Sequence, residues 1–285
     1  MSYTQVRGVK HYYEWITSAP SPSGTPKEIM VFLHGWGGSA RYWESVAHRL
    51  SERFDCLLYD LRGFGRSQAS PDVSRQAVKQ IYDLETYALD LAAFLESLGL
   101  EKIHLQAHST GSSIAALFMN RYPEQVERAI LACNGIFEFE AKAFEQFHRF
   151  GELVIKFRPK WMLAIPGLEH LFMARFLDQS IPRPLKVQFL ADFVDADQQA
   201  ALGTMLTAVS QQSAQAMPAE FARIHCPTLL ISGQSDRIIP AQMGARAADL
   251  NEHIVHRIIP NTGHFPMLEA PEAYLQEVQE FLALA

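Results

Sequence analysis

Five short, mostly apolar runs, each bounded by residues typical of turns, constrain the fold of this chain more than any other feature. Runs of this kind are typical of strands covered on both faces, and such strands belong to parallel sheets. Residues 1–17, rich in Tyr, Val, Ile and Trp, precede them and predict a short antiparallel pair. The five runs lie at residues 29–33, 56–59, 103–106, 129–132 and 228–231.

Helical patterns separate several of these runs. Apolar residues recur at intervals of three and four at Ala88, Leu91, Leu95 and Leu98. Pro271 precedes another apolar repeat, as a proline at the first helical position does. Strand and helix therefore alternate, which predicts an α/β fold with right-handed crossovers and a doubly wound, mostly parallel sheet. Ligand sites in such folds lie at the carboxyl ends of the strands.

The segment 136–218 departs from the alternation, because it holds long helical patterns and no convincing buried strand. We expect an inserted helical cap between two parts of the core, residues 1–135 and 219–285. Ten of the 18 Phe residues fall in this segment. Apolar surface is therefore concentrated there, and we expect the segment to bury it against other parts of the molecule.

The charge balance and the hydropathy disfavour some classes of function. The chain has 25 Lys and Arg against 31 Asp and Glu, a formal charge of −6, which provides no basic field for nucleic acid or an anionic membrane. Nowhere do 18 consecutive apolar residues occur, and the first residues lack the apolar core of a signal peptide. We therefore predict a soluble, cytoplasmic protein without an integral membrane segment, acting on a small molecule.

The cysteines indicate no metal or disulfide framework. Cys56, Cys133 and Cys226 stand alone at separations of 77 and 93 residues, with no CxxC pair. Each lies in or beside an apolar run, where a reduced thiol packs as a small apolar side chain. This usage fits a reducing compartment.

The most specific local pattern is Leu-Gln-Ala-His-Ser-Thr-Gly-Ser-Ser-Ile, in which a strand pattern runs into Ser109 and a helix of small residues follows. A strained turn that exposes a serine between strand and helix needs small residues two positions before and after it, because the two elements approach closely. Ala107 and Gly111 occupy these positions, with Ala replacing the usual first glycine. The alternative is an ordinary turn in which the serine caps the helix.

Three further loops follow predicted strands. A His-Gly-Trp-Gly-Gly loop begins at His34, and its glycines let backbone amides turn inward. A structural histidine in a glycine-rich turn is the alternative interpretation. Ser-Gly-Gln-Ser-Asp ends at Asp236, and Gly-His-Phe contains His264. These loops add a carboxylate and an imidazole to the same edge of the predicted sheet as Ser109.

Together, these motifs resemble those of the α/β-hydrolase superfamily. The resemblance rests on the HGWGG loop, the turn Asp-Leu-Arg-Gly-Phe-Gly-Arg-Ser that starts at Asp60, the AHSTG elbow, the SGQSD loop and the GHF loop. The order of serine, acid and histidine along the chain is also that of this superfamily. The motifs cover the core, roughly residues 29–135 and 219–285.

The resemblance implies a role for each residue. Ser109 is the expected nucleophile, His264 the base that takes its proton, and Asp236 the acid that holds the imidazole. The backbone N–H groups of Trp36 and Thr110 are the expected donors to an oxyanion. A serine at the elbow also argues against the epoxide hydrolases and haloalkane dehalogenases of this fold, which use a carboxylate. Acyl transfer to water is favoured, and no metal or organic cofactor is implied.

Several other residues are candidates for the site. Glu138, just after a predicted strand, is the alternative acid, because some relatives resemble that arrangement. Asp60 is interpreted as a residue that fixes its own loop. His108, beside the nucleophile, is expected to pack or hydrogen-bond under the elbow, and Cys133 is expected to pack without reacting.

We expect a serine hydrolase that cleaves a carboxylic ester of an apolar small molecule through an acyl-enzyme. One alternative is a carbon–carbon bond hydrolase that acts on a diketone or dienone with the same three residues. Another is a hydrolase-like binding or accessory protein that holds an apolar ligand beneath the cap. Residue spacing does not identify the natural substrate or the oligomeric state.

Overall fold

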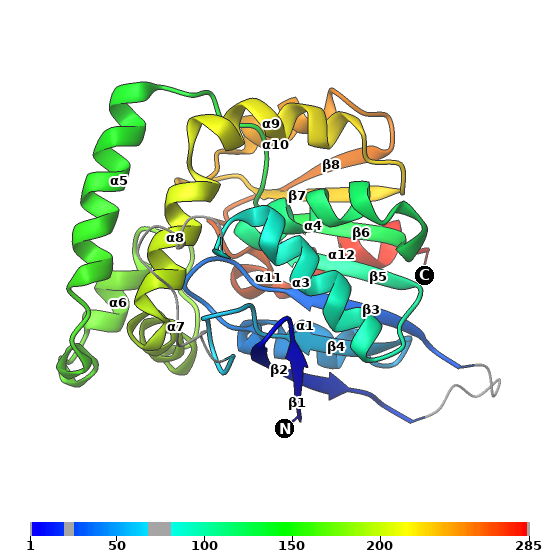
Figure 1. Cartoon of the computed structure of the whole chain (residues 1–285), viewed down its shortest axis with the longest axis horizontal. Helices are drawn as coiled ribbons and strands as arrows, with labels where there is room; N and C mark the ends of the chain where they lie inside the picture. Colours follow the sequence, from blue (N-terminus) through cyan, green and yellow to red (C-terminus); the bar gives the residue numbers. More distant parts are fainter. Residues whose placement is uncertain (1, 20–25, 68–80, 284–285) are drawn as a thin grey trace.

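The computed structural model describes residues 2–19, 26–67 and 81–283, and these residues form one mixed sheet with helices on both faces. The sheet has eight strands in the order β1-β2-β4-β3-β5-β6-β7-β8 (Figure 1). The strand β2 runs antiparallel to both of its neighbours, and all pairs from β4 to β8 are parallel. The strands are β1 (Ser2–Val6), β2 (Val9–Ile16), β3 (Glu28–Leu33), β4 (Phe54–Tyr59), β5 (Ile103–His108), β6 (Val126–Ala132), β7 (Thr228–Gly233) and β8 (Ile254–Ile259).

The strand β3 shows why the apolar runs become strands covered on both faces. Successive side chains of a strand point to opposite faces of the sheet. Val31 and Leu33 pack in one core cluster, whereas Met30 and Phe32 pack in a second cluster on the other face. All four side chains are buried. The predicted α/β fold with a doubly wound, mostly parallel sheet is therefore confirmed.

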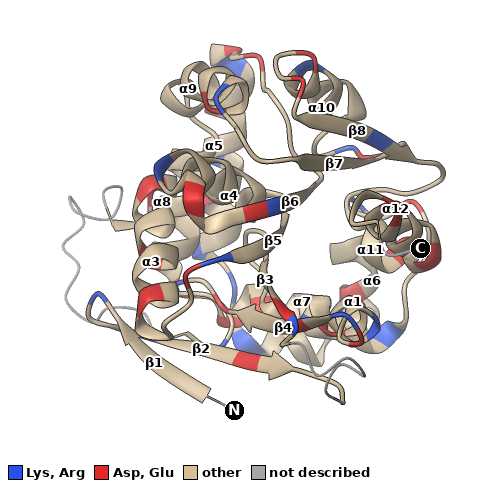
Figure 2. Cartoon of the chain, turned by 90° about the vertical axis from the view of Figure 1, so that its right-hand side faces the viewer, with Lys and Arg blue, Asp and Glu red and all other residues tan. Residues whose placement is uncertain are grey.

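Two layers of helices cover the sheet. One layer contains α3 (Leu84–Ser97), α4 (Thr110–Arg121), α9 (Gln211–Ala222) and α10 (Ala241–Ala248). The other contains α1 (Glu44–Leu50), α11 (Pro266–Glu269) and α12 (Pro271–Phe281). In Figure 2, α3 and α4 lie on one side of the sheet and α11 and α12 on the other. Both helices predicted from periodicity are present, and Pro271 begins α12 as expected.

The chain between β6 and β7 is helical, as predicted, and every residue of the segment 136–218 is described. It contains α5 (Ala141–Lys156), the 3₁₀ helix η3 (Lys160–Ala164), α6 (Leu168–Met173), α7 (Arg183–Asp195) and α8 (Gln198–Ala208) before α9 begins. We call the part from α5 to α8 the cap. The predicted boundary at Pro218 falls inside α9, which packs against α4 and α10 of the core.

All three cysteines are free thiols that lie in or near the core. Cys56 and Cys133 are buried free thiols, and Cys226 is a half-buried one. Basic and acidic residues are interspersed over the elements visible in Figure 2. Within the described residues, no helix combines the length and the apolar character needed to cross a membrane.

Candidate active site

Ser109 lies at the sharp junction between β5 and α4. Its backbone angles, φ 53° and ψ −122°, lie in a region that residues with a side chain rarely adopt. A Cβ atom on Gly111 would lie 2.5 Å from the carbonyl oxygen of His34, so a glycine is required there. Ala107 is fully buried, and its methyl group is accommodated. The local pattern of small residues therefore produces the strained turn that the sequence predicts.

The three residues predicted as a triad meet at the carboxyl edge of the sheet. The Ser109 Oγ lies 3.0 Å from His264 Nε2, and His264 Nδ1 lies 2.7 Å from Asp236 Oδ2. The other carboxylate oxygen, Oδ1, accepts the backbone N–H groups of Ile238 and Ile239 at 2.8 and 3.0 Å. Both oxygens of Asp236 therefore have donors, which fixes the carboxylate against the imidazole.

The loop that carries His264 is anchored by Glu269, a residue that the sequence analysis did not identify. The Glu269 carboxylate is buried and accepts the backbone N–H groups of Gly263 and Phe265 at 3.0 and 3.1 Å. It also accepts the N–H groups of Asp178 and Gln179 from the cap at 2.7 and 2.8 Å. One carboxylate thus joins the histidine loop to the cap.

The HGWGG loop packs directly against the elbow. A Cβ atom on Gly35 would lie 3.1 Å from the Ser109 Cβ, so the loop approaches the serine at backbone distance. Thr110 is the first residue of α4, where the helix dipole favours negative charge. The Trp36 side chain donates from Nε1 to the Ala201 carbonyl of α8 at 2.8 Å. The residues expected to donate to an oxyanion therefore lie in the two segments that meet at Ser109.

A buried hydrogen-bond chain runs under the elbow. The Gly35 N–H donates to the Tyr42 hydroxyl at 2.5 Å, and this hydroxyl donates to His108 Nδ1 at 3.0 Å. The His108 Nε2–H donates to the His264 carbonyl at 2.7 Å. Burial, together with the neighbouring His264, lowers the pKa of His108 well below its ordinary value, so the ring is neutral. The predicted role of His108 as a hydrogen-bonding residue under the elbow is confirmed.

The surroundings of Cys133 and Asp60 suit structural roles. The Cys133 thiol is fully buried, and burial, with the nearby Asp236 carboxylate, raises its pKa well above the ordinary value, so it stays protonated. Buried Asp60 accepts the backbone N–H groups of Ala40 and Arg66, both at 2.8 Å. Burial acts to raise the pKa of Asp60, but the hydrogen bonds from Arg66 prevail and lower it. The predicted loop-fixing role of Asp60 is therefore confirmed.

Glu138, the alternative acid, lies outside this cluster. Its side chain is exposed and pairs with Arg246 at 2.5 Å on the surface. The position facing His264 Nδ1 belongs to Asp236. The strand preceding Glu138 ends at Ala132, and the intervening residues carry the glutamate away from the imidazole.

The cap contributes aromatic side chains to the site. The Phe176 ring lies 6.3 Å from the His264 ring, and the Phe193 ring lies 5.7 Å from that of Trp36. Phe189 and Phe172 extend the same layer through further ring contacts. The expectation that the segment buries its apolar surface against other parts of the molecule holds only in part of the segment, for these four Phe residues. Other Phe side chains of the segment are exposed, namely Phe139, Phe147, Phe150 and Phe157.

A buried carboxylate also ties the cap to the core near Trp36. Asp192 of α7 accepts a hydrogen bond from the Ser39 hydroxyl at 2.5 Å and pairs with Arg41 at 2.5 Å. Burial raises the pKa of Asp192 to about 6, although the Ser39 and Arg41 contacts act in the opposite direction. Nothing local in the sequence marks Asp192, because its partners lie more than 150 residues away along the chain.

One group of side chains in the described structure has the proximity of a metal site. Ligand atoms of His108, Cys133 and His264 lie within 4.8 Å of one another. All four imidazole nitrogens already contact hydrogen-bonding partners, and the thiol is held protonated. The arrangement therefore suits hydrogen bonding and proton transfer rather than metal coordination.

Comparison with known proteins supports the fold and identifies the family. A family model described as alpha/beta hydrolase fold matches residues 28–271. The 2-hydroxy-6-oxononadienedioate/2-hydroxy-6-oxononatrienedioate hydrolase of Klebsiella pneumoniae is 26% identical over 284 residues, covering 92% of this chain and 89% of that protein. Among solved structures, a bacterial membrane phospholipase A is 27% identical, with a TM-score of 0.78 over 99% of this chain and 85% of that one. An esterase from Exiguobacterium antarcticum shares the fold, with 22% identity and a TM-score of 0.80 over 99% of each chain.

Proposed function

Because this chain belongs to the alpha/beta hydrolase fold family, we propose that it is a serine hydrolase that cleaves a carboxylic ester of an apolar small molecule. The observation that carries the proposal is the unbroken contact from Ser109 Oγ through the His264 imidazole to the Asp236 carboxylate, at 3.0 and 2.7 Å. This arrangement activates a hydroxyl that is a weak nucleophile at neutral pH.

The hydrogen bonds determine the direction of proton transfer. Because Asp236 accepts from His264 Nδ1, the proton of the neutral imidazole resides on Nδ1 and the Nε2 lone pair faces Ser109. His264 takes the serine proton as Oγ attacks the ester carbonyl carbon, and Asp236 stabilises the resulting imidazolium. The tetrahedral intermediate collapses to an acyl-enzyme, and His264 returns the proton to the leaving alcohol.

Water completes the reaction by the reverse sequence. His264 takes a proton from a water molecule, the hydroxide attacks the acyl carbon, and the proton returns to Ser109 Oγ as the carboxylic acid leaves. In both halves the carbonyl oxygen becomes negative, and the proposed donors to it are the backbone N–H groups of Trp36 and Thr110. The start of α4 adds the positive end of a helix dipole at this point.

The aromatic layer supports the proposed substrate class. Phe172, Phe176, Phe189 and Phe193 form a connected set of rings between the cap and the loops that carry His264 and Trp36. An apolar acyl or aryl group bound there would be removed from water. We propose that the cap covers the site in this way. The similarity to a phospholipase A, named for an ester substrate, favours an ester over other acyl compounds.

Carbon–carbon bond hydrolysis is the second candidate. It is favoured by the similarity to the Klebsiella pneumoniae hydrolase, whose named substrate is an oxo-dienedioate. The same three side chains serve both reactions, so the distinction depends on which substrate is turned over and on its products. Release of an alcohol and an acid identifies ester cleavage, whereas loss of the dienone absorbance identifies carbon–carbon cleavage.

Covalent labelling followed by a substrate panel tests the proposal. A fluorophosphonate should label the wild-type chain and leave Ser109→Ala unlabelled, because only an activated serine reacts. Labelled enzyme should lose its turnover of p-nitrophenyl acyl esters in parallel. A chain that is neither labelled nor active on these esters and on dienones would favour a binding protein with a hydrolase fold.

A further inference from the structure

One face of the helix α5 packs on α8. Ile155 is buried, and a Cβ atom on Gly151 would lie 2.3 Å from the Met205 Sδ, so the two helices are in close contact. His148 hydrogen-bonds to the Val209 carbonyl at the end of α8. At 100° per residue these contacts occupy one side of α5. The other sides of α5 face solvent or the ends of the cap.

A second face of α5 is apolar and exposed. Phe147, Phe150, Leu153 and Phe157 recur every three or four residues and are 44%, 69%, 64% and 63% exposed. The row continues onto η3, where the 59%-exposed Trp161 contacts the Phe157 ring at 6.3 Å between centroids. We call these five residues the cap stripe. Further exposed apolar residues adjoin it in sequence, namely Leu163, Ile165 and Leu171.

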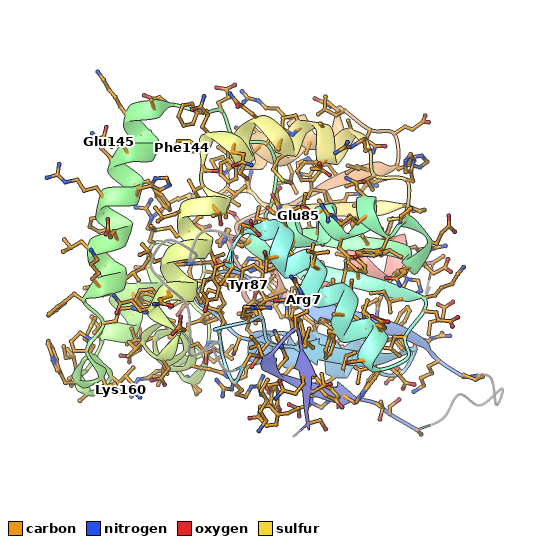
Figure 3. All side chains as sticks on the ribbon, in the orientation of Figure 1. Arg7, Glu85, Tyr87, Phe144, Glu145 and Lys160 are labelled. Carbon is orange, nitrogen blue, oxygen red and sulfur yellow. The ribbon has the colours of Figure 1, made fainter. Side chains whose placement is uncertain are left out.

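The cap stripe differs in position and extent from the single apolar residues that most protein surfaces expose. Figure 1 shows α5 at the outer edge of the molecule, beyond α8. In Figure 3, Glu145 lies near the upper end of α5 and Lys160 near the lower end of the cap, and the stripe residues from Phe147 to Phe157 lie between these two positions in the chain. Single exposed apolar side chains are ordinary on protein surfaces, but a row of five exposed apolar residues, four of them aromatic, is typical of a binding surface.

The charges around the stripe are opposite in sign to the charge of the whole chain. Segment 147–175 has five basic residues, Arg149, Lys156, Arg158, Lys160 and Arg175, against two acidic residues, Glu152 and Glu169. Glu152 pairs with Lys156 at 2.6 Å and Glu169 with Arg183 at 2.8 Å. Of the basic residues, Lys160 pairs with Asp195 of α7 at 3.0 Å, and Arg158 donates to backbone carbonyls of the cap. The segment therefore has a formal charge of +3 in a chain of −6.

We propose that the cap stripe docks on an anionic lipid surface. A helix with Phe, Leu and Trp on one face and Lys and Arg beside it is the pattern of an interfacial helix. Basic side chains next to it gain free energy near anionic headgroups, whereas a second copy of the same +3 surface would be repelled. The net charge of −6 led to the expectation that no anionic membrane is bound, but that value averages over the whole chain.

Docking of the cap stripe would bring lipid close to the proposed active site. The docking itself does not require the proposed reaction. In α6, Leu171 is 74% exposed, whereas the next residue, Phe172, contacts Phe193 at 5.1 Å between rings. Neighbouring positions of one short helix thus face the outside of the cap and the aromatic layer. An apolar substrate dissolved in the bilayer would be separated from that layer only by the cap.

Vesicle co-sedimentation of the full chain tests the proposal. The probes are phosphatidylcholine vesicles with and without about one third phosphatidylglycerol. The triple variant Phe150→Gln, Leu153→Gln, Phe157→Gln should bind anionic vesicles at least about tenfold more weakly, because three exposed apolar side chains lose their burial in lipid. The matched control changes three exposed apolar residues elsewhere, Leu250→Gln, Val255→Gln, Ile258→Gln, and should bind as the wild type does.

The charge contribution is tested separately. Lys156→Gln and Arg149→Gln should each weaken binding to anionic vesicles by about fivefold and leave binding to neutral vesicles unchanged. Ser109→Ala should sediment as the wild type does, so a failure of the proposed reaction would not affect this result. The single variant Phe150→Gln, which changes the residue of the stripe with the largest exposed fraction, provides a second test should the triple variant unfold.

Specific outcomes would overturn the proposal. One is equal binding of wild type and triple variant to anionic vesicles while both show the same thermal unfolding curve by circular dichroism. Another is no wild-type binding beyond that to neutral vesicles. A third is a concentration-dependent wild-type dimer in light scattering that the triple variant abolishes, because a second copy would then occupy the stripe.

Discussion

Replacing Glu269 by Gln should destabilise the protein and impair the proposed reaction together. The buried carboxylate accepts four backbone N–H groups, two from the histidine loop and two from the cap. A glutamine offers one oxygen, and its NH₂ group would face donors. With the amide oxygen in place of Oε2, only the Phe265 N–H loses its acceptor, whereas the opposite orientation leaves the N–H groups of Asp178 and Gln179 without one. Each lost acceptor costs about 1–3 kcal/mol. The free energy of unfolding should therefore fall by about 1–6 kcal/mol, and by about 1–3 kcal/mol if the amide takes the less costly orientation.

Urea unfolding followed by circular dichroism measures this loss, and ester hydrolysis measures its effect on the site. Because Gly263 and Phe265 flank His264, kcat should fall more than KM changes. Glu272→Gln is the matched control, since that glutamate is exposed and pairs only with Arg49 in the described residues. Its unfolding midpoint should match the wild type. An unchanged midpoint and kcat in Glu269→Gln would refute the reasoning.

Other perturbations test the site and its connection to the cap. Ser109→Ala should lower ester hydrolysis by at least about 10³-fold with an unchanged melting curve, and a variant that retains a tenth of the activity would contradict the nucleophile assignment. Asp236→Asn should be severely impaired and Glu138→Gln active, with the reverse result identifying the wrong acid. Because the pKa of Asp192 is raised to about 6, the native state holds a proton that the unfolded state releases above about pH 4. The free energy of unfolding should therefore fall as pH rises from about 4 to about 6, by up to about 3 kcal/mol, and Asp192→Asn should lack this part of the dependence in urea titrations. Across p-nitrophenyl acetate to hexanoate, kcat/KM should rise by up to about fourfold per methylene until the aromatic layer is filled, and equal values for both esters would contradict an apolar pocket.

The sheet and the residues that meet at its edge were predictable because their signals are local. Each strand is a short run whose burial is visible in its composition, and Ser109, Asp236 and His264 follow such runs in motifs of a few residues. The elbow glycine is required by contact with a neighbouring loop, yet the sequence marks it by spacing alone. The local sequence patterns therefore predicted that these side chains follow strands at one edge of the sheet, and they predicted the order of the three residues along the chain.

The supporting contacts were not predictable, because they join segments that are distant along the chain. Glu269 meets Asp178 across 91 residues, and Asp192 meets Ser39 across 153. Each carboxylate by itself resembles any charged surface residue. The many Phe residues of the cap were apparent in the sequence, but composition does not tell which face of a helix meets the core. Phe150 and Phe176 are the same residue type in the same segment, and only one of them contacts the aromatic layer.

The insertion of the cap between β6 and β7 has a consequence for biosynthesis. In the sheet β7 covers the edge of β6, but 95 residues separate Ala132 from Thr228. At typical elongation rates the ribosome adds that many residues in about 5–20 s, during which a nascent β6 presents an unpaired, apolar edge. The exposed α5 is synthesised in the same interval. Each new chain therefore exposes the edge of β6 and the apolar face of α5 before β7 is synthesised. Protection by a chaperone would matter most during that period.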